Sequence, residues 1–307
     1  MLDVLIIGAG AAGITAAIYA ARAELKFEII SKDVGGLTLW SPDIENYPGY
    51  HDLNGIELVE KFKEHMDQYD IKVKDDTVEK VEKKDNNFLV KTKEGREYET
   101  KTVIVCSGSS PRKLKVDGAE KYEGKGVAYC ATCDGPLFKD KDVAVVGGGD
   151  SAVTSAQTLL KIANKIHIIN RGDELTGRDK ERIKKVKESD KVEIINNADT
   201  KEILGKDDFV NKLKYEKDGE EKTIDVEGIF VEIGHIRNTD MVKNLIKLND
   251  KNEIIVDESG AASEKGVYAA GDVTSLPGKQ TVIACGDGSR TLLTAFDYIS
   301  KKGESDD

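Results

Sequence analysis

The chain has 307 residues, of which 39% are hydrophobic, which is enough for two globular domains with sizeable cores. Its formal net charge of −11 argues against nucleic acid and anionic membranes as main partners. Four cysteines are too few for a disulfide scaffold, no apolar run approaches the ~20 residues that span a bilayer, and no signal peptide precedes the first apolar run, so we expect a cytoplasmic protein.

Apolar, β-branched runs predict an α/β fold with two βαβ units. In the first unit a buried parallel strand (residues 2–7) leads into an alanine-rich helix (11–22) and a second strand (27–30). A second unit follows in the middle of the chain, and a helix closes the chain. The further expected elements are strands at 103–106, 143–146, 166–169, 229–233 and 266–270, and helices at 151–162, about 178–187 and about 288–299.

This order predicts two Rossmann-like nucleotide-binding domains, the second inserted into the first. The first domain is discontinuous and comprises residues 1–114 and 242–307, and the inserted domain comprises residues 115–241. Linkers are expected near residues 111–118 and 235–241. We expect residues 304–307 to form a frayed acidic tail.

Three glycines at the first strand-to-helix turn predict a dinucleotide site. Gly8 permits the tight turn, Gly10 lets the backbone approach a phosphate, and Gly13 lets the helix pack closely on the strand. A Rossmann-like unit that binds nothing is the alternative, and the position of the turn between a strand and a helix argues against it. No acid stands at the end of the second strand to bind a ribose, since Asp33 comes slightly later.

A second turn of this kind contains Gly147 and Gly149, with Ala152 in place of the third glycine. The strand after it ends in neither the acid of an NAD site nor the arginine cluster of an NADP site, and a single arginine, Arg171, stands there. A working nucleotide site and a degenerate one both remain open.

Cys130 and Cys133, followed directly by Asp134, lie between the two turns. Cysteines at this spacing can close a small disulfide ring and exchange two electrons as a unit, and the adjacent acid can supply or accept a proton. A zinc site would need two more ligands, whereas Cys106 and Cys285 are isolated, and two inert core thiols are the other alternative. The pattern favours redox chemistry, and we expect no metal.

In combination, these motifs resemble the low-molecular-weight flavin thioredoxin reductases along nearly the whole chain. The resemblance implies that the first and last segments bind FAD, that the middle domain carries the disulfide, and that the protein is a homodimer whose two domains swivel. It also implies electron transfer from FAD to the disulfide and on to thioredoxin, with Cys133 nearer the flavin. Further positions expected on the flavin side are Gly35, Gly36, Leu37, Asn46, Gly108, Gly271, Asp272 and Gln280.

The chain departs from the NADPH-using members of that family at the second nucleotide site. Those members carry a His-Arg-Arg motif where this chain has Asn170, Arg171 and Gly172, and a further arginine where it has Thr176. Residues 153–156 read Val-Thr-Ser-Ala where two glutamates are usual, and Leu37 replaces a usual glutamine. Similar losses occur in relatives that take electrons from ferredoxin or a reduced deazaflavin.

We therefore expect an FAD-dependent thioredoxin reductase whose electron donor is ferredoxin rather than NADPH. The basic segment 178–187 is either a solvated helix face or a docking patch. Three alternatives remain open: an NADPH-dependent thioredoxin reductase with weakened affinity, a ferredoxin–NADP reductase-like flavoprotein, against which the cysteine pair argues, and a non-enzymatic flavin redox sensor.

Overall fold

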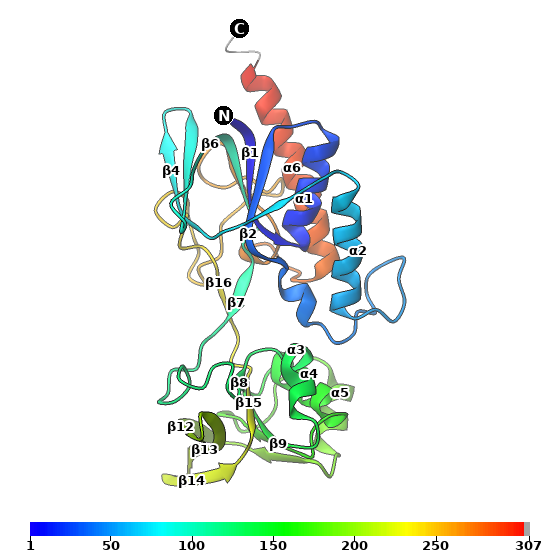
Figure 1. Ribbon diagram of the computed structural model, residues 1–307, viewed down its shortest axis with the longest axis vertical. Coiled ribbons are helices and arrows are strands. Elements are labelled where there is room, and N and C mark those ends of the chain that lie inside the picture. The colour runs from blue at the N-terminus through cyan, green and yellow to red at the C-terminus, as the bar shows by residue number, and fades with distance from the viewer. Residues whose placement is uncertain (304–307) are drawn as a thin grey trace. The chain divides into compact units, whose positions relative to one another are not determined.

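The computed structural model describes residues 1–303, without the side chains of 302 and 303, and divides into two compact units (Figure 1). Unit 1 comprises residues 1–110 and the chain from residue 236 onward, and unit 2 comprises residues 111–235. The boundaries expected from the sequence, after 114 and 241, lie a few residues later at both crossings. Short strands β7 (Ser109–Pro111) and β16 (His235–Arg237) pair where the chain passes between the units. The expected tail at 304–307 lies outside the described residues.

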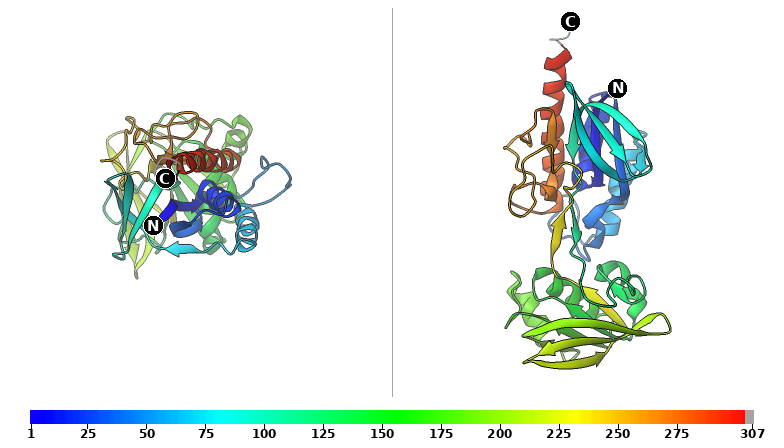
Figure 2. Two further views of the ribbon diagram at one scale, coloured as in Figure 1. Left: turned by 90° about the horizontal axis from the view of Figure 1, so that it is seen from above. Right: turned by 90° about the vertical axis from the view of Figure 1, so that its left-hand side faces the viewer.

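Unit 1 contains, within the described residues 1–303, a seven-stranded sheet in the order β3-β2-β1-β6-β5-β4, with β17 added beside β6. β1, β2, β3, β6 and β17 pair in parallel, whereas β4, β5 and β6 form an antiparallel meander. Helices α1 and α6 lie side by side (Figures 1 and 2). The elements of this unit are β1 (Leu2–Gly10), α1 (Ala11–Arg22), β2 (Phe27–Gly35), the 3-10 helix η1 (Gly36–Trp40), α2 (Gly55–Asp67), β3 (Val73–Asp75), β4 (Val78–Lys84), β5 (Asn87–Thr92), β6 (Glu97–Val105), β17 (Val267–Ala269), the 3-10 helix η3 (Gly271–Val273) and α6 (Thr281–Gly303).

The apolar run of β1 exists because this strand is buried on both faces. Val4 and Ile6 belong to the core cluster that includes α1 and α6, and Leu5 and Ile7 belong to the cluster on the opposite face. Alternate side chains of a strand point to opposite faces, so a strand covered on both sides must be apolar throughout. The glycine turn at the end of β1 is therefore held by a rigid central strand.

Unit 2 contains the five-stranded parallel sheet β11-β10-β9-β15-β8 within the described residues. Helices α4 and α5 pack against one face, and the three-stranded antiparallel sheet β12-β13-β14 covers the other (Figure 2). The elements of this unit are β8 (Val127–Ala128), α3 (Ala131–Asp134), the 3-10 helix η2 (Gly135–Phe138), β9 (Asp142–Val146), α4 (Asp150–Leu160), β10 (Lys165–Ile169), α5 (Lys180–Lys187), β11 (Val192–Ile195), β12 (Ala198–Lys206), β13 (Phe209–Lys217), β14 (Glu220–Asp225) and β15 (Gly228–Val231).

The C-terminal helix begins earlier than the sequence predicts. α6 starts at Thr281 rather than near Gly288, so this glycine lies inside the helix. A Cβ atom at Gly288 would lie 2.1 Å from the carbonyl oxygen of Ala12, so the missing side chain lets α6 approach the start of α1. Within residues 1–303, no helix combines the length and apolarity needed to cross a membrane.

Candidate active site

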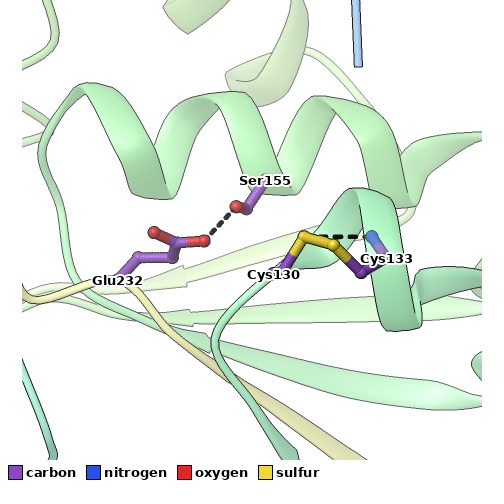
Figure 3. Close-up of a disulfide and its surroundings, with 4 residues drawn as sticks. All are labelled: Cys130, Cys133, Ser155 and Glu232. Atoms are coloured by element: carbon purple, nitrogen blue, oxygen red, sulfur yellow. Dashed lines mark hydrogen bonds between the residues drawn. A yellow bond between two sulfur atoms is a disulfide. The ribbon is translucent and has the colours of Figure 1, made fainter. Parts of the chain in front are cut away.

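The cysteine pair of unit 2 is a disulfide at the start of a short helix. The Cα atoms of Cys130 and Cys133 are 5.3 Å apart, and the backbone N–H of Cys133 donates a hydrogen bond to Cys130 Sγ at 3.1 Å (Figure 3). Cys130 is buried, at 6% exposure, whereas Cys133 is exposed. Cys133 is therefore the more accessible sulfur, and Cys130 is largely covered by protein.

Asp134, the acid expected to move protons, ends α3 and is partly buried. Burial raises the pKa of its carboxyl above the ordinary value, because the charged form loses hydration. The carboxyl group therefore retains its proton to a higher pH than an exposed aspartate does.

A second acid near the disulfide is not among the residues predicted from the sequence. Glu232 directly follows β15, and its carboxylate accepts a hydrogen bond from the Ser155 hydroxyl on α4 (Figure 3). Burial raises the pKa of Glu232 to about 7, although the Ser155 hydrogen bond acts in the opposite direction. One acid at the end of an otherwise apolar run, Ile229 to Ile233, is the sequence signal that marks it.

In unit 1 the first glycine turn has the geometry of a dinucleotide cradle. Gly8 has φ +100° and its missing Cβ would lie 2.4 Å from the carbonyl oxygen of Cys106. A Cβ at Gly13 would lie 1.9 Å from the Gly8 carbonyl oxygen, whereas a Cβ at Gly10 would have open space around it. Gly10 caps α1 without a side-chain hydrogen bond, so the first N–H groups of the helix are available to a phosphate. The residues present fit the pyrophosphate of FAD.

A second glycine pair lies beside this cradle. Gly10 pairs with Gly35 across β1 and β2, and a Cβ at Gly36 would lie 3.5 Å from Gly10 Cα. Gly35 has φ +107°, a backbone conformation that favours glycine, and its missing Cβ would lie 2.7 Å from a methyl group of Val59. Leu37 follows in η1 and is half-buried.

Most of the other residues expected on the flavin side gather at the same end of unit 1. Asn46 Nδ2 donates to Gln280 Oε1 at 2.9 Å, which joins two segments far apart in the chain. A Cβ at Gly271 would lie 3.1 Å from Ala12 Cβ, so this glycine and Asp272 in η3 adjoin the start of α1. Gly108 has φ +59°, and its carbonyl accepts a hydrogen bond from the backbone N–H of residue 238 at 3.1 Å.

The second glycine turn, in unit 2, also opens a helix without a side-chain cap. Gly149 precedes α4, and a Cβ there would have open space. Gly147 has φ +139°, and its Cβ would lie 3.4 Å from Ala152 Cβ, which shows how alanine fits at the position of the third glycine. Asp150 adds a carboxylate in the first turn of α4, where the helix dipole otherwise favours a phosphate. Its Oδ1 accepts the backbone N–H of Arg178 at 2.5 Å.

The loop after β10 closes over the side chain of Asn170. Asn170 is buried and its Nδ2 donates to the carbonyl oxygens of Gly172 and Glu174 at 3.2 and 2.9 Å. Its Oδ1 lies 2.1 Å from where a Cβ of Gly148 would be, so it packs directly on the glycine turn. Arg171 projects into solvent, with 86% of its side chain exposed and Asp199 at 4.0 Å. The structure therefore provides no arginine cluster at this loop within the described residues.

The two remaining cysteines differ in environment. Cys106 is buried in the core of unit 1, and burial raises the pKa of its thiol. Cys285 is a free cysteine, as expected, and its Sγ accepts a hydrogen bond from the Tyr47 hydroxyl at 3.7 Å. No group of three or more metal-binding side chains occurs among residues 1–303.

Residues 2–288 match the family model of the pyridine nucleotide-disulphide oxidoreductases. The chain belongs to this family. FAD is the cofactor of this family, and the cradle in unit 1 fits that group.

Curated relatives are longer than this chain. It is 39% identical over 300 residues to "NADH dehydrogenase" of Bacillus subtilis, covering 97% of this chain and 58% of that protein. It is equally identical to a protein of Staphylococcus aureus that is named as part of alkyl hydroperoxide reductase, covering 59% of that protein. The chain thus spans a little under 60% of the length of these relatives.

Several similar solved structures of about the same length are of thioredoxin reductases. That of Lactococcus lactis, in its FR conformation, has a TM-score of 0.89 at 32% identity and covers 98% of this chain and 100% of its own. That of T. acidophilum has a TM-score of 0.85 at 37% identity and covers 96% and 98%. A ferredoxin-flavin thioredoxin reductase of Clostridium acetobutylicum has a TM-score of 0.54 at 32% identity and covers 98% of both chains.

Proposed function

We propose that the chain is an FAD-dependent thioredoxin reductase that takes electrons from ferredoxin. The glycine cradle of unit 1 would hold FAD, which would supply the two electrons that convert the Cys130–Cys133 disulfide to a dithiol. The dithiol then reduces the disulfide of thioredoxin by exchange. The observation that carries the proposal is the redox disulfide of unit 2 beside a nucleotide turn that lacks its arginines.

The division of labour between the two sulfurs follows from their exposure. Cys133 is exposed and receives the electrons from the flavin, so Cys130 is the sulfur released when the disulfide opens. The backbone N–H of Cys133 stabilises negative charge on Cys130. We assign to Asp134 the proton exchange at the exposed sulfur, since it directly follows Cys133.

A weak NADPH site supports ferredoxin as the donor. Asn170 fills the base of the loop where an arginine cluster would bind the 2′-phosphate, and Asp150 places negative charge at the start of α4. Ferredoxin needs no nucleotide pocket. Its docking would use the basic helix α5, whose Lys184 and Lys185 are exposed, although both also pair with glutamates of the same segment.

The test is anaerobic flavin bleaching with reduced ferredoxin, NADPH and NADH in parallel, followed by measurement of thioredoxin thiols. We expect bleaching and thiol release with ferredoxin. Rapid bleaching by micromolar NADPH would instead assign the chain to the NADPH-dependent class, which the retained turn at Gly147 and Gly149 favours as the second candidate. Reduction of a peroxidase disulfide in place of the thioredoxin disulfide is the outcome that the relative named for alkyl hydroperoxide reductase suggests.

We also propose that the protein is a homodimer, as the family resemblance implies. Helix α6 exposes several large apolar side chains, including Leu293 at 53% and Phe296 at 36%, which is unfavourable for a free surface. Light scattering of the FAD-bound protein tests this proposal, and a monomer at micromolar concentration would contradict it.

A further inference from the structure

The mechanism proposed above leaves the proton for Cys130 without a source. Asp134 follows the exposed Cys133, whereas Cys130 is buried and has little contact with bulk water. A sulfur released in such a place carries negative charge until a nearby group gives it a proton. The question is which acid of unit 2 faces the buried sulfur.

The strand register of unit 2 answers this question. β8 and β15 are adjacent parallel strands, with Phe230 paired to Ala128. Counted on by two residues from the Phe230–Ala128 pair, past the ends of both strands, the same register would set Glu232 opposite Cys130. Adjacent strands lie about 4.8 Å apart, and residues two apart on a strand point to the same face. Phe230 and Ala128 face the core cluster under α3 and α4, so Glu232 and Cys130 point to that side as well.

The close-up view agrees with this placement. Figure 3 shows the Glu232 carboxylate and the disulfide on the same side of α4, with the Ser155 hydroxyl reaching down to the carboxylate. Ala131, which follows Cys130, and Ala152 and Ala156, which flank Ser155 on α4, belong to one apolar cluster. The acid and the buried sulfur thus share a largely apolar surrounding.

The acidic side chains of β9 and α4 have partners elsewhere. Asp142 on β9 accepts a hydrogen bond from Asn164 at 2.7 Å, and Asp150, the only ionisable residue of α4, accepts one from the backbone of Arg178. On α3 the ionisable side chain is Asp134, beside the exposed sulfur. Ser155, which donates to Glu232, carries no charge, and no ion pair of Glu232 occurs in the described part of the chain. Burial accordingly raises the pKa of Glu232 to about 7.

We propose that Glu232 is the proton donor to Cys130. The disulfide takes two electrons from the reduced flavin, the S–S bond breaks, and the Cys130 sulfur receives the proton of the Glu232 carboxyl, which is then reprotonated from solvent. Once ionised, the Glu232 carboxylate keeps the Cys130 thiol protonated, because two adjacent negative charges are unfavourable. This inference rests on the proposed disulfide chemistry.

The test measures alkylation of the Cys130 thiol by iodoacetamide between pH 5.5 and 8.5, in the FAD-bound full chain carrying Cys133→Ser. Peptide mass spectrometry separates Cys130 from Cys106 and Cys285. Rates are compared with and without Glu232→Gln, which removes the charge and keeps the shape. The matched control is Glu193→Gln on β11, a glutamate of the same unit that pairs with Lys165.

We expect Glu232→Gln to leave the alkylation rate unchanged at pH 5.5, where Glu232 is neutral in both proteins, and to raise it roughly tenfold at pH 8.5. A tenfold change corresponds to a thiol pKa about one unit lower. Glu193→Gln should change neither rate. If the ratio of the alkylation rates with and without Glu232→Gln is the same at pH 5.5 and pH 8.5, the effect is merely structural and the inference is overturned.

Ser155→Ala provides a second variant should Glu232→Gln fail to fold. Loss of this hydrogen bond raises the pKa of Glu232, so the inflection in the alkylation profile moves to higher pH. An unmoved inflection also overturns the inference. Neither measurement needs an electron donor or thioredoxin, so failure of the proposed function shows separately, as absent thioredoxin reduction by the unsubstituted chain.

Discussion

Arginines introduced at the second nucleotide site should allow the chain to bind NADPH and accept electrons from it. Gly172 is exposed, and a Cβ there would meet the nearest atoms at 3.5 Å, an ordinary contact. Thr176 is exposed as well, and its backbone N–H donates to the Gly148 carbonyl at 2.8 Å, which places it beside the glycine turn. Asn170 is buried and hydrogen-bonded, so it is left unchanged. The variant is therefore Gly172→Arg with Thr176→Arg.

The size of the expected gain follows from the bonds that two arginines add. A hydrogen bond to a charged group contributes about 1.5–3 kcal/mol, so two arginine–phosphate contacts contribute about 3–6 kcal/mol. Tenfold in affinity corresponds to about 1.4 kcal/mol, so the dissociation constant for NADPH should fall by roughly two to four orders of magnitude. NADH, which lacks the 2′-phosphate, should gain far less.

The assay is titration of anaerobic flavin bleaching with NADPH and NADH. Glutamine at positions 172 and 176 serves as the control, because it adds similar length without charge. Equal gains for the arginine and glutamine variants would show that charge is not the missing element. Bleaching of the unsubstituted chain at micromolar NADPH would show that the loop after β10 already binds the phosphate, and would refute the reasoning.

Three further outcomes are expected. Cys130→Ser or Cys133→Ser should abolish thioredoxin reduction and leave flavin reduction by the donor intact, and normal thioredoxin turnover by both variants would contradict this. Gly13→Ala should lower both thermal stability and FAD content, because a Cβ at this position would lie 1.9 Å from a carbonyl oxygen. Gly10→Ala should fold normally, because a Cβ there has open space. Equal melting temperatures for the two variants would refute the packing argument. Burial alone would raise the pKa of Glu253, but hydrogen bonds from Asn249 and Arg237 hold this pKa below the ordinary value. The ionised Glu253 therefore stabilises the fold above the pKa of the unfolded state, and this stabilisation is lost as the pH falls through the pKa of the folded state. Glu253→Gln should accordingly lower the melting temperature more at pH 7 than at pH 3, and an equal decrease at both pH values would contradict this reasoning.

The sequence predicts the parts of the fold that depend on local pattern. The first helix is found at residues 11–22, as predicted, because an apolar run, a glycine turn and an alanine-rich segment follow one another. Helix α2 is missing from the prediction, although Asn54 and Glu57 form a capping box that marks its start. The sheet β12-β13-β14 is also missing. Its strands carry many charged residues on an exposed face, which hides the alternation of their apolar side chains.

In the candidate site, too, the sequence predicts the local motifs but not the contacts between distant segments. Cys130, Cys133 and the glycine turns are short motifs whose geometry is set within a few residues, so the sequence is sufficient to find them. Glu232 lies about a hundred residues from Cys130 in the chain and comes beside it only because β15 is the neighbour of β8 in the sheet. A strand order of this kind is a property of the assembled sheet and not of either segment, so no local pattern identifies the pair.

The position of the Glu232 carboxylate links two features of unit 2, the residues at 153–156 of α4 and the acid near the disulfide. Helix α4 lacks the glutamates usual at residues 153–156, and the space next to Ser155 is taken by Glu232, which arrives from β15. A carboxylate on α4 would be available to a bound nucleotide. The carboxylate that follows β15 is instead held by Ser155, in a largely apolar environment that raises the pKa of Glu232 to about 7. The proposed loss of NADPH binding and the proposed proton donor at Glu232 would then be two results of the same rearrangement. The prediction specific to this link is that Ser155→Glu with Glu232→Gln restores an acid on α4 and strengthens NADPH-dependent bleaching only when the arginines at positions 172 and 176 are also present.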